Sequence, residues 1–181
     1  GKESASYAVA FGNIGFCLFH AGDIEGAVPM IQESEKLYKP HIPTKSSRTM
    51  AFLKMNIAYG LGELGRCEEA LKAYDEAYPL FVDTFGDVSD EMAAFYESKS
   101  RSYSNASPPR TKESLKTLEK VIEIRKQLPI ETKTAQAYVM YGNESVQDMS
   151  LDTAARFTIT VTAFEKAVEL YKSLPTDHKW E

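Results

Sequence analysis

The sequence predicts an all-α protein built from about four helical hairpins, and two observations carry this prediction. The first is a repeat: pairs of small residues twelve positions apart return every 40 to 44 residues along the chain. The second is the spacing of apolar residues around these pairs, which is typical of amphipathic helices. With 181 residues, 43% of them apolar, and a net charge of −5, the composition fits a compact domain and argues against wholesale disorder.

The small-residue pairs mark the places where the two helices of a hairpin cross. The pairs are Gly15 with Ala27, Ala58 with Ala70, Ser102 with Ser114, and Gly142 with Ala154. Helix axes approach to about 8 Å only where a short side chain lies at the crossing. The residues four and seven positions after each second member share its helix face, so we expect them in the core: Ile31 and Ser34, Tyr74 and Ala77, Leu118 and Val121, and Thr158 and Val161.

This pattern predicts eight helices. We expect them over residues 5–21, 24–38, 46–63, 67–83, 89–106, 110–127, 131–148 and 151–173. Gly22 and Gly65 stand where a helix ends in a left-handed residue, which glycine adopts without strain. Asp23 and Ser89 each precede a helix and carry side chains that suit an N-cap.

The second repeat resembles a tetratricopeptide repeat (TPR). The family's signature places hold Ala58, Gly65, Ala70, Tyr74 and Ala77. The period exceeds the usual ~34 residues and is similar to that of the long-period variety found in kinesin light chain. The resemblance implies a right-handed α-α superhelix forming a single domain over residues 1–181, with repeats at roughly 5–43, 46–88, 89–129 and 131–175. An irregular all-helical bundle is the alternative fold.

The chain offers little for catalysis or metal binding. Its three histidines, His20, His41 and His178, are far apart in sequence, and no glycine-rich loop is present that would cradle a phosphate. Neither Cys17 nor Cys67 lies in a CxxC motif or a Cys/His cluster. We therefore expect no enzymatic activity, no cofactor and no metal site.

Charge and hydropathy argue against two further classes of partner. The basic residues are dispersed in a mildly acidic chain, so we expect no nucleic-acid binding. No stretch reaches the ~18 apolar residues of a membrane-spanning helix, so we expect no membrane association. The apolar run over residues 7–19 lacks the basic start and cleavage site of a signal peptide, and we expect a cytoplasmic protein. Because the chain begins with Gly1, we also expect it to be part of a longer protein.

The TPR resemblance directs attention to the first helix of each hairpin, which lines the concave face in that family. One position after each crossing residue stand Phe16, Tyr59, Tyr103 and Asn143. Two positions before it stand Asn13, Asn56, Ser100 and Met140, and six positions before it stand Val9, Phe52, Tyr96 and Gln136. Exposed aromatic rings give a large contact area at a small entropic cost, and amides pair with a peptide backbone.

From these rows we predict a non-catalytic protein-interaction module that binds a peptide or helical segment in the concave groove. The predicted binding residues are Phe16, Tyr59, Tyr103, Asn13, Asn56, Phe52, Tyr96 and Asn143. The alternative is a purely structural role, in which several rings pack between hairpins or are covered by a flanking segment. Two alternative functions are an oligomerisation or structural segment of a larger signalling protein, which could form homo-oligomers, and a sensor domain for a signalling peptide.

Overall fold

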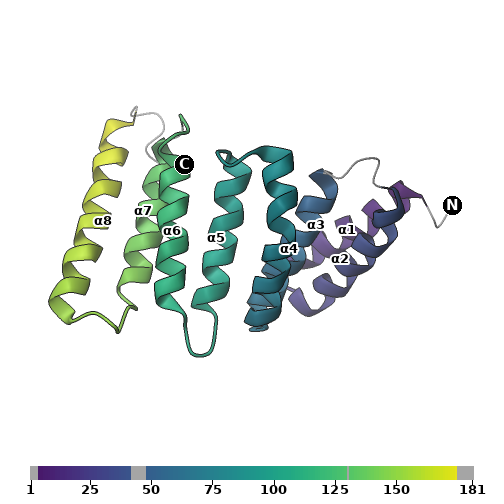
Figure 1. Ribbon diagram of the computed structural model, residues 1–181, viewed down its shortest axis with the longest axis horizontal. Helices are drawn as coiled ribbons and strands as arrows, with labels where there is room; N and C mark the ends of the chain where they lie inside the picture. Colours follow the sequence, from purple (N-terminus) through teal and green to yellow (C-terminus); the bar gives the residue numbers. More distant parts are fainter. Residues whose placement is uncertain (1–3, 42–47, 130, 175–181) are drawn as a thin grey trace. The chain divides into compact units, whose positions relative to one another are not determined.

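A computed structural model describes residues 4–41, 48–129 and 131–174. In these ranges the chain is all-α, with eight α-helices, one short 3-10 turn at Lys39–His41 and no β-strand (Figure 1). The helices are α1 (Ala5–His20), α2 (Ile24–Tyr38), α3 (Arg48–Glu63), α4 (Cys67–Phe85), α5 (Asp90–Ser104), α6 (Thr111–Arg125), α7 (Glu131–Ser145) and α8 (Thr153–Ser173). Among the described residues, every predicted helix end lies within three residues of the observed one, apart from the start of the third helix, since residues 46–47 lie outside them.

The chain divides into two compact units. Unit 1 comprises Gly1–Gly86 and Asn105–Pro108, and unit 2 comprises Asp87–Ser104 and Pro109–Glu181. Consecutive helices pair as hairpins, α1 with α2 and α3 with α4 in unit 1, and α5 with α6 and α7 with α8 in unit 2. Within each unit the second helix of one hairpin also packs on the first helix of the next, α2 on α3 and α6 on α7.

In the core of unit 1, α4 contributes three fully buried residues, Tyr74, Ala77 and Phe81. Ala58 and Ala70, the predicted crossing pair, are also fully buried. In the first hairpin, a Cβ on Gly15 would lie 3.0 Å from the carbonyl oxygen of Ala27, so the backbones are in close approach there. The predicted close approach of Gly15 and Ala27 is thus confirmed, and Ala58 and Ala70 lie in the core as predicted.

The turns of unit 1 follow the predicted chemistry. Gly22 and Gly65 have φ angles of 83° and 73°, a region that side-chain-bearing residues rarely adopt. The Asp23 carboxylate accepts a hydrogen bond from the Gly26 backbone N–H at 2.9 Å and so caps α2.

Unit 2 has a polar crossing and a buried charge. The third hairpin of the chain, α5 with α6, crosses at the buried Ser114. Its hydroxyl lies 3.1 Å from that of Ser100 and 3.0 Å from that of Ser104. The Arg125 guanidinium, 5% exposed, pairs with Asp90 and, at 3.1 Å, with Glu97, both on α5. Lys133 on α7 also pairs with Asp90, so one carboxylate links three helices.

The predicted crossing in the fourth hairpin is wrong. Ala154 and Thr158 are exposed, and a Cβ on Gly142 would instead lie 2.8 Å from the ring of Phe164. In the first hairpin the same place opposite Gly15 is taken by Ile31, so Phe164 is the counterpart of Ile31. The register of α8 is therefore shifted by six residues. Two features produce the shift. The connection between α7 and α8 spans residues 146–152, longer than residues 21–23 and 64–66 in the first two hairpins. In addition, Phe164 lies about one turn further from the start of α8 than Ile31 lies from the start of α2.

Candidate interaction surface

The predicted binding residues of α1 are accessible. Phe16 is 52% exposed, and its ring stands edge-on to that of His20 with centroids 4.4 Å apart. Asn13, one turn earlier on the same face, is exposed as well. This face of α1 thus presents an aromatic ring beside an amide, the combination that the sequence predicts.

On α3 the predicted residues are half-buried. Asn56 and Tyr59 lie one turn apart on one face, and the Tyr59 ring tilts against that of Phe19 from α1, with centroids 5.7 Å apart. Phe52 is used differently, because its ring packs edge-on against Phe81 and Phe85 of α4, at centroid distances of 5.8 and 5.4 Å. Phe52 therefore contributes to packing within the hairpin, which is the structural role given above as the alternative to binding.

In unit 2 the predicted aromatic residues have cationic neighbours. The Arg110 guanidinium lies 4.9 Å from the centroid of the Tyr103 ring, and the Lys120 amine lies 5.4 Å from that of Tyr96. Both tyrosines are half-buried. Cation–π contacts of this kind hold a ring in one orientation. Asn143, on α7, is exposed.

The structure thus brings the predicted residues together in pairs. The pairs on one helix face are Asn13 with Phe16 on α1, Asn56 with Tyr59 on α3, and Tyr96 with Tyr103 on α5. The first two pairs belong to unit 1 and the third to unit 2.

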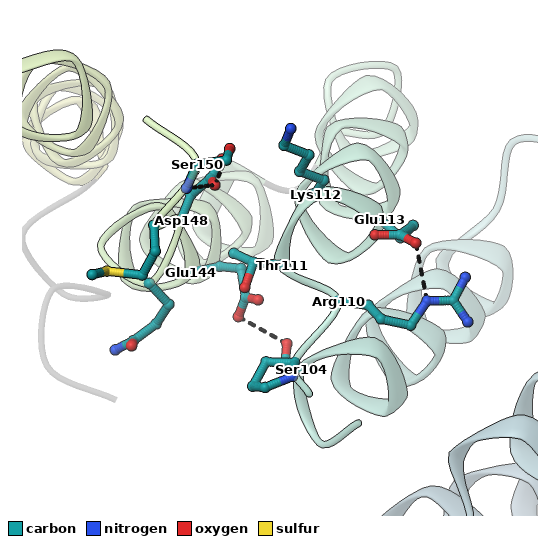
Figure 2. A pocket seen from close by; sticks show the side chains of 11 residues that line it. Ser104, Arg110, Thr111, Lys112, Glu113, Glu144, Asp148 and Ser150 are labelled. Atoms are coloured by element: carbon teal, nitrogen blue, oxygen red, sulfur yellow. Dashed lines mark hydrogen bonds and ion pairs between the residues drawn. The ribbon is translucent and has the colours of Figure 1, made fainter. Parts of the chain in front are cut away.

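Sequence reasoning missed a polar cleft in unit 2. It has a volume of about 610 Å³ and is formed by the end of α5, the start of α6 and the segment after α7 (Figure 2). Figure 2 shows Ser104 and Glu144 facing each other in it, with the Ser104 hydroxyl donating to the carboxylate at 2.8 Å. The cleft depends on the long connection after α7. The repeat pattern in the sequence does not predict this connection, so it does not predict the cleft.

Most charged groups of this cleft have a hydrogen-bond partner within its lining. Arg110 donates to Glu113 at 3.0 Å, and Asp148 accepts from the backbone N–H and the hydroxyl of Ser150. The hydrogen bond from the Ser150 hydroxyl is the main cause that lowers the pKa of Asp148 below its ordinary value. The residues that line the cleft include no histidine and no cysteine.

Across residues 4–41, 48–129 and 131–174, no group of three or more His, Cys, Asp and Glu side chains is arranged to hold a metal ion. Within the same part of the chain, no helix is both long enough and apolar enough to cross a membrane.

Comparison with known proteins gives relatives by structure alone. No family model matches the sequence, and no curated protein matches it either. A crystal structure of BtubC (BKLC) from P. vanneervenii superposes with a TM-score of 0.76 over 92% of this chain, at 18% identity. A putative kinesin light chain with nearly identical TPR-like repeats, from Podosopora anserina, superposes with a TM-score of 0.75 over 97% of this chain, at 13% identity.

The two relatives are longer than this chain. The matched region spans 63% of the BtubC chain and 80% of the Podosopora anserina chain. At these identities the similarity shows a shared fold, that of an all-α helical repeat solenoid of the TPR-like kind.

Proposed function

We propose that this TPR-like repeat protein is a non-catalytic interaction module that binds a peptide or short helix of a partner protein along the first helices of its hairpins. TPR-like folds generally mediate protein–protein interaction, and the finer assignment rests on one observation. At the same repeat position, α1, α3 and α5 each carry an aromatic residue: Phe16, Tyr59 and Tyr103. α7 departs from the pattern with Asn143.

The chemistry of unit 1 suits an extended peptide or one turn of a helix. Phe16 supplies a rigid and accessible apolar contact, while Tyr59 is braced by Phe19 and would lose little freedom on binding. Asn13 and Asn56 stand one turn before these rings, where an amide can donate to a peptide carbonyl and accept from a peptide N–H. A short peptide held in this way binds with an affinity on the order of micromolar, because ordering it offsets much of the contact energy. We expect this to occur in the cytoplasm.

The experiment is a capture assay followed by a direct binding measurement. Wild-type protein and the double variant Phe16→Ala/Tyr59→Ala are used to capture partners from a lysate, after circular dichroism has shown equal helicity. The matched control is Phe157→Ala, which removes a ring that is 70% exposed on α8, outside the proposed surface. Overlapping synthetic peptides that cover the sequence of the captured partner are then made, and the affinity of each is measured by fluorescence anisotropy.

The proposal predicts that one peptide binds wild type and Phe157→Ala equally and binds the double variant at least about tenfold more weakly, a loss of about 1.4 kcal/mol. Equal binding to all three proteins would reject the surface on α1 and α3. Failure of the double variant to fold would place Phe16 or Tyr59 in the core, and the single variant Asn13→Asp, at an exposed position, would then replace it.

A further inference from the structure

The same groove recurs in both units, and each time three consecutive helices line it. In unit 1 residues of α2, α3 and α4 line a groove of about 290 Å³, and in unit 2 residues of α6, α7 and α8 line one of about 400 Å³. They are called here the unit 1 groove and the unit 2 groove. Each groove lies within one unit, and the two differ in chemistry.

Paired charges cross the unit 1 groove. The Lys54 amine of α3 forms one ion pair with Glu35 of α2 at 2.8 Å and a second with Glu76 of α4 at 3.3 Å. A ligand that entered this groove would have to separate charges that are already paired.

The centre of the unit 2 groove is apolar instead. Phe164, the counterpart of Ile31, sets the alignment of α8 with α2 and α4. The three charges of the unit 1 groove then correspond, in chain order, to Ile122, Tyr138 and Lys166. Ile122 and Tyr138 are buried, and Ile159 and Ala163 of α8 extend the same apolar floor.

One end of the unit 2 groove is basic. The Lys126 amine of α6 lies 5.7 Å from the centroid of the Tyr138 ring, and the Lys166 amine of α8 lies 5.5 Å from it. Within the part of the chain that the structure describes, neither amine forms an ion pair. A carboxylate placed between these two cations would be attracted by both.

The other end is acidic. Glu119 and Glu123 lie one turn apart on α6, and both are exposed. The Tyr141 hydroxyl donates to the Glu119 carboxylate at 3.2 Å. Burial raises the pKa of Tyr141, and the Glu119 charge raises it further, so the hydroxyl stays protonated as a donor. The unit 2 groove therefore has an apolar floor between ends of opposite charge.

From this polarity we infer that the unit 2 groove binds a short peptide segment of a partner protein in which an apolar side chain stands next to an acidic one. The apolar side chain lies on the floor, and the carboxylate lies between Lys126 and Lys166. The volume is in the range of ligand sites, and the exposed rim leaves the peptide backbone outside the groove. The site uses neither Phe16 nor Tyr59, so it is separate from the surface proposed on α1 and α3.

The first test is a selection of short random peptides, displayed on phage, against the wild-type protein. Enriched peptides are synthesised, and fluorescence anisotropy measures their affinity for wild type, for Lys166→Glu and for the control Lys72→Glu. Lys166 is exposed, so its variant should fold, and circular dichroism checks this. Lys72 is an exposed lysine that lines the unit 1 groove, so the control makes the same change of charge in the other groove.

The inference predicts enriched peptides that combine an apolar residue with a neighbouring Asp or Glu. They should bind wild type and Lys72→Glu equally and bind Lys166→Glu at least about tenfold more weakly. Replacing the acidic residue of the peptide by lysine should restore binding to Lys166→Glu. A selection that yields only peptides insensitive to Lys166→Glu would overturn the inference, even if those peptides bind the surface on α1 and α3.

The second test locates the bound peptide and examines the apolar floor. Amide chemical shifts of the isotope-labelled protein should change in α6, α7 and α8 when the selected peptide is added, and changes centred on α1 and α3 would contradict the inference. Ile159→Glu, at a half-buried position, introduces the residue type that the unit 1 groove carries at the corresponding Glu69. It should also weaken binding at least about tenfold, because the apolar contact is lost. Unchanged affinity would show that the floor is not used.

Discussion

At the scale of single residues, the protein uses short side chains to bring helices together and one buried charge to join three of them. Gly15 lets α1 approach the backbone of α2, and Ser114 does the same for α5 and α6 with hydroxyl contacts in place of apolar ones. Arg125 is a buried cation. Its guanidinium is almost fully buried, and its carboxylate partners are about a third exposed.

The first prediction concerns Arg125. Arg125→Met should lower the free energy of unfolding by about 2–3 kcal/mol, because Asp90 and Glu97 lose their buried partner, although their own exposure moderates the cost. Urea unfolding followed by circular dichroism measures the change. Arg66→Met is the control, since Arg66 forms an exposed pair with Glu69 on one helix, and its unfolding midpoint should be unchanged. Equal effects of both substitutions would argue against a special role for the buried guanidinium.

The second prediction concerns pH. The hydrogen bond from Lys133 holds the pKa of Asp90 below its ordinary value, and the nearby Arg125 charge lowers it further. A lowered carboxyl pKa stabilises the fold above the unfolded-state pKa, about 3.9, and that stability is lost as the pH falls through the lowered folded-state value. The urea concentration at the midpoint of unfolding should therefore decrease as the pH is lowered below about 4. Asp90→Asn should make the profile flatter in this range, and an unchanged profile would contradict the assignment.

At the scale of elements, the hairpins keep one crossing geometry while their connections vary. The first two hairpins turn within three residues, because Gly22 and Gly65 end a helix sharply. After α7 the chain takes seven residues, builds the polar cleft of Figure 2, and enters α8 with the register displaced. The early turns of α8, around exposed Ala154, therefore lie outside the crossing, and Phe164 packs at it instead.

The third prediction tests this register. Ala154→Phe should change the free energy of unfolding by no more than about 0.5 kcal/mol, because the residue is exposed. Ala70→Phe should cost about 1–3 kcal/mol or more by overpacking, because Ala70 is fully buried at the crossing of α3 and α4. Thermal and urea unfolding measure both. A large decrease in the free energy of unfolding for Ala154→Phe would instead support the predicted crossing of Gly142 with Ala154.

At the scale of the whole molecule, burial is concentrated in the inner helices of each unit. α3 and α6 each contribute eight buried residues, whereas α1 and α8 contribute two each although they are at least as long. In a repeat protein, stability is carried by contacts between neighbours, so a helix with one covered side opens at a lower cost.

The fourth prediction is a gradient of amide hydrogen exchange. In dilute solution, amides of α1 and α8 should exchange faster than those of α3, α4 and α6, because fewer buried contacts must break to open them. Mass spectrometry of peptic fragments resolves each helix. Uniform protection would show that the units open as wholes.

Local signals in the sequence are enough to define the helices and most of the hairpin geometry. Helix periodicity, the glycines at residues 22 and 65 and the cap at Asp23 act over a few residues, so the pattern alone assigns Ile31, Tyr74 and Val121 correctly to the core. The same logic failed at Ala154, because the length of an irregular connection is not encoded in the helix pattern.

The use of the predicted surface residues, in contrast, depends on tertiary packing. Phe52 and Phe16 are both predicted binding residues, yet Phe52 packs on Phe81 and Phe85 while Phe16 is half exposed. The difference depends on which helices lie nearby, and such contacts between segments distant in sequence carry no periodic signature.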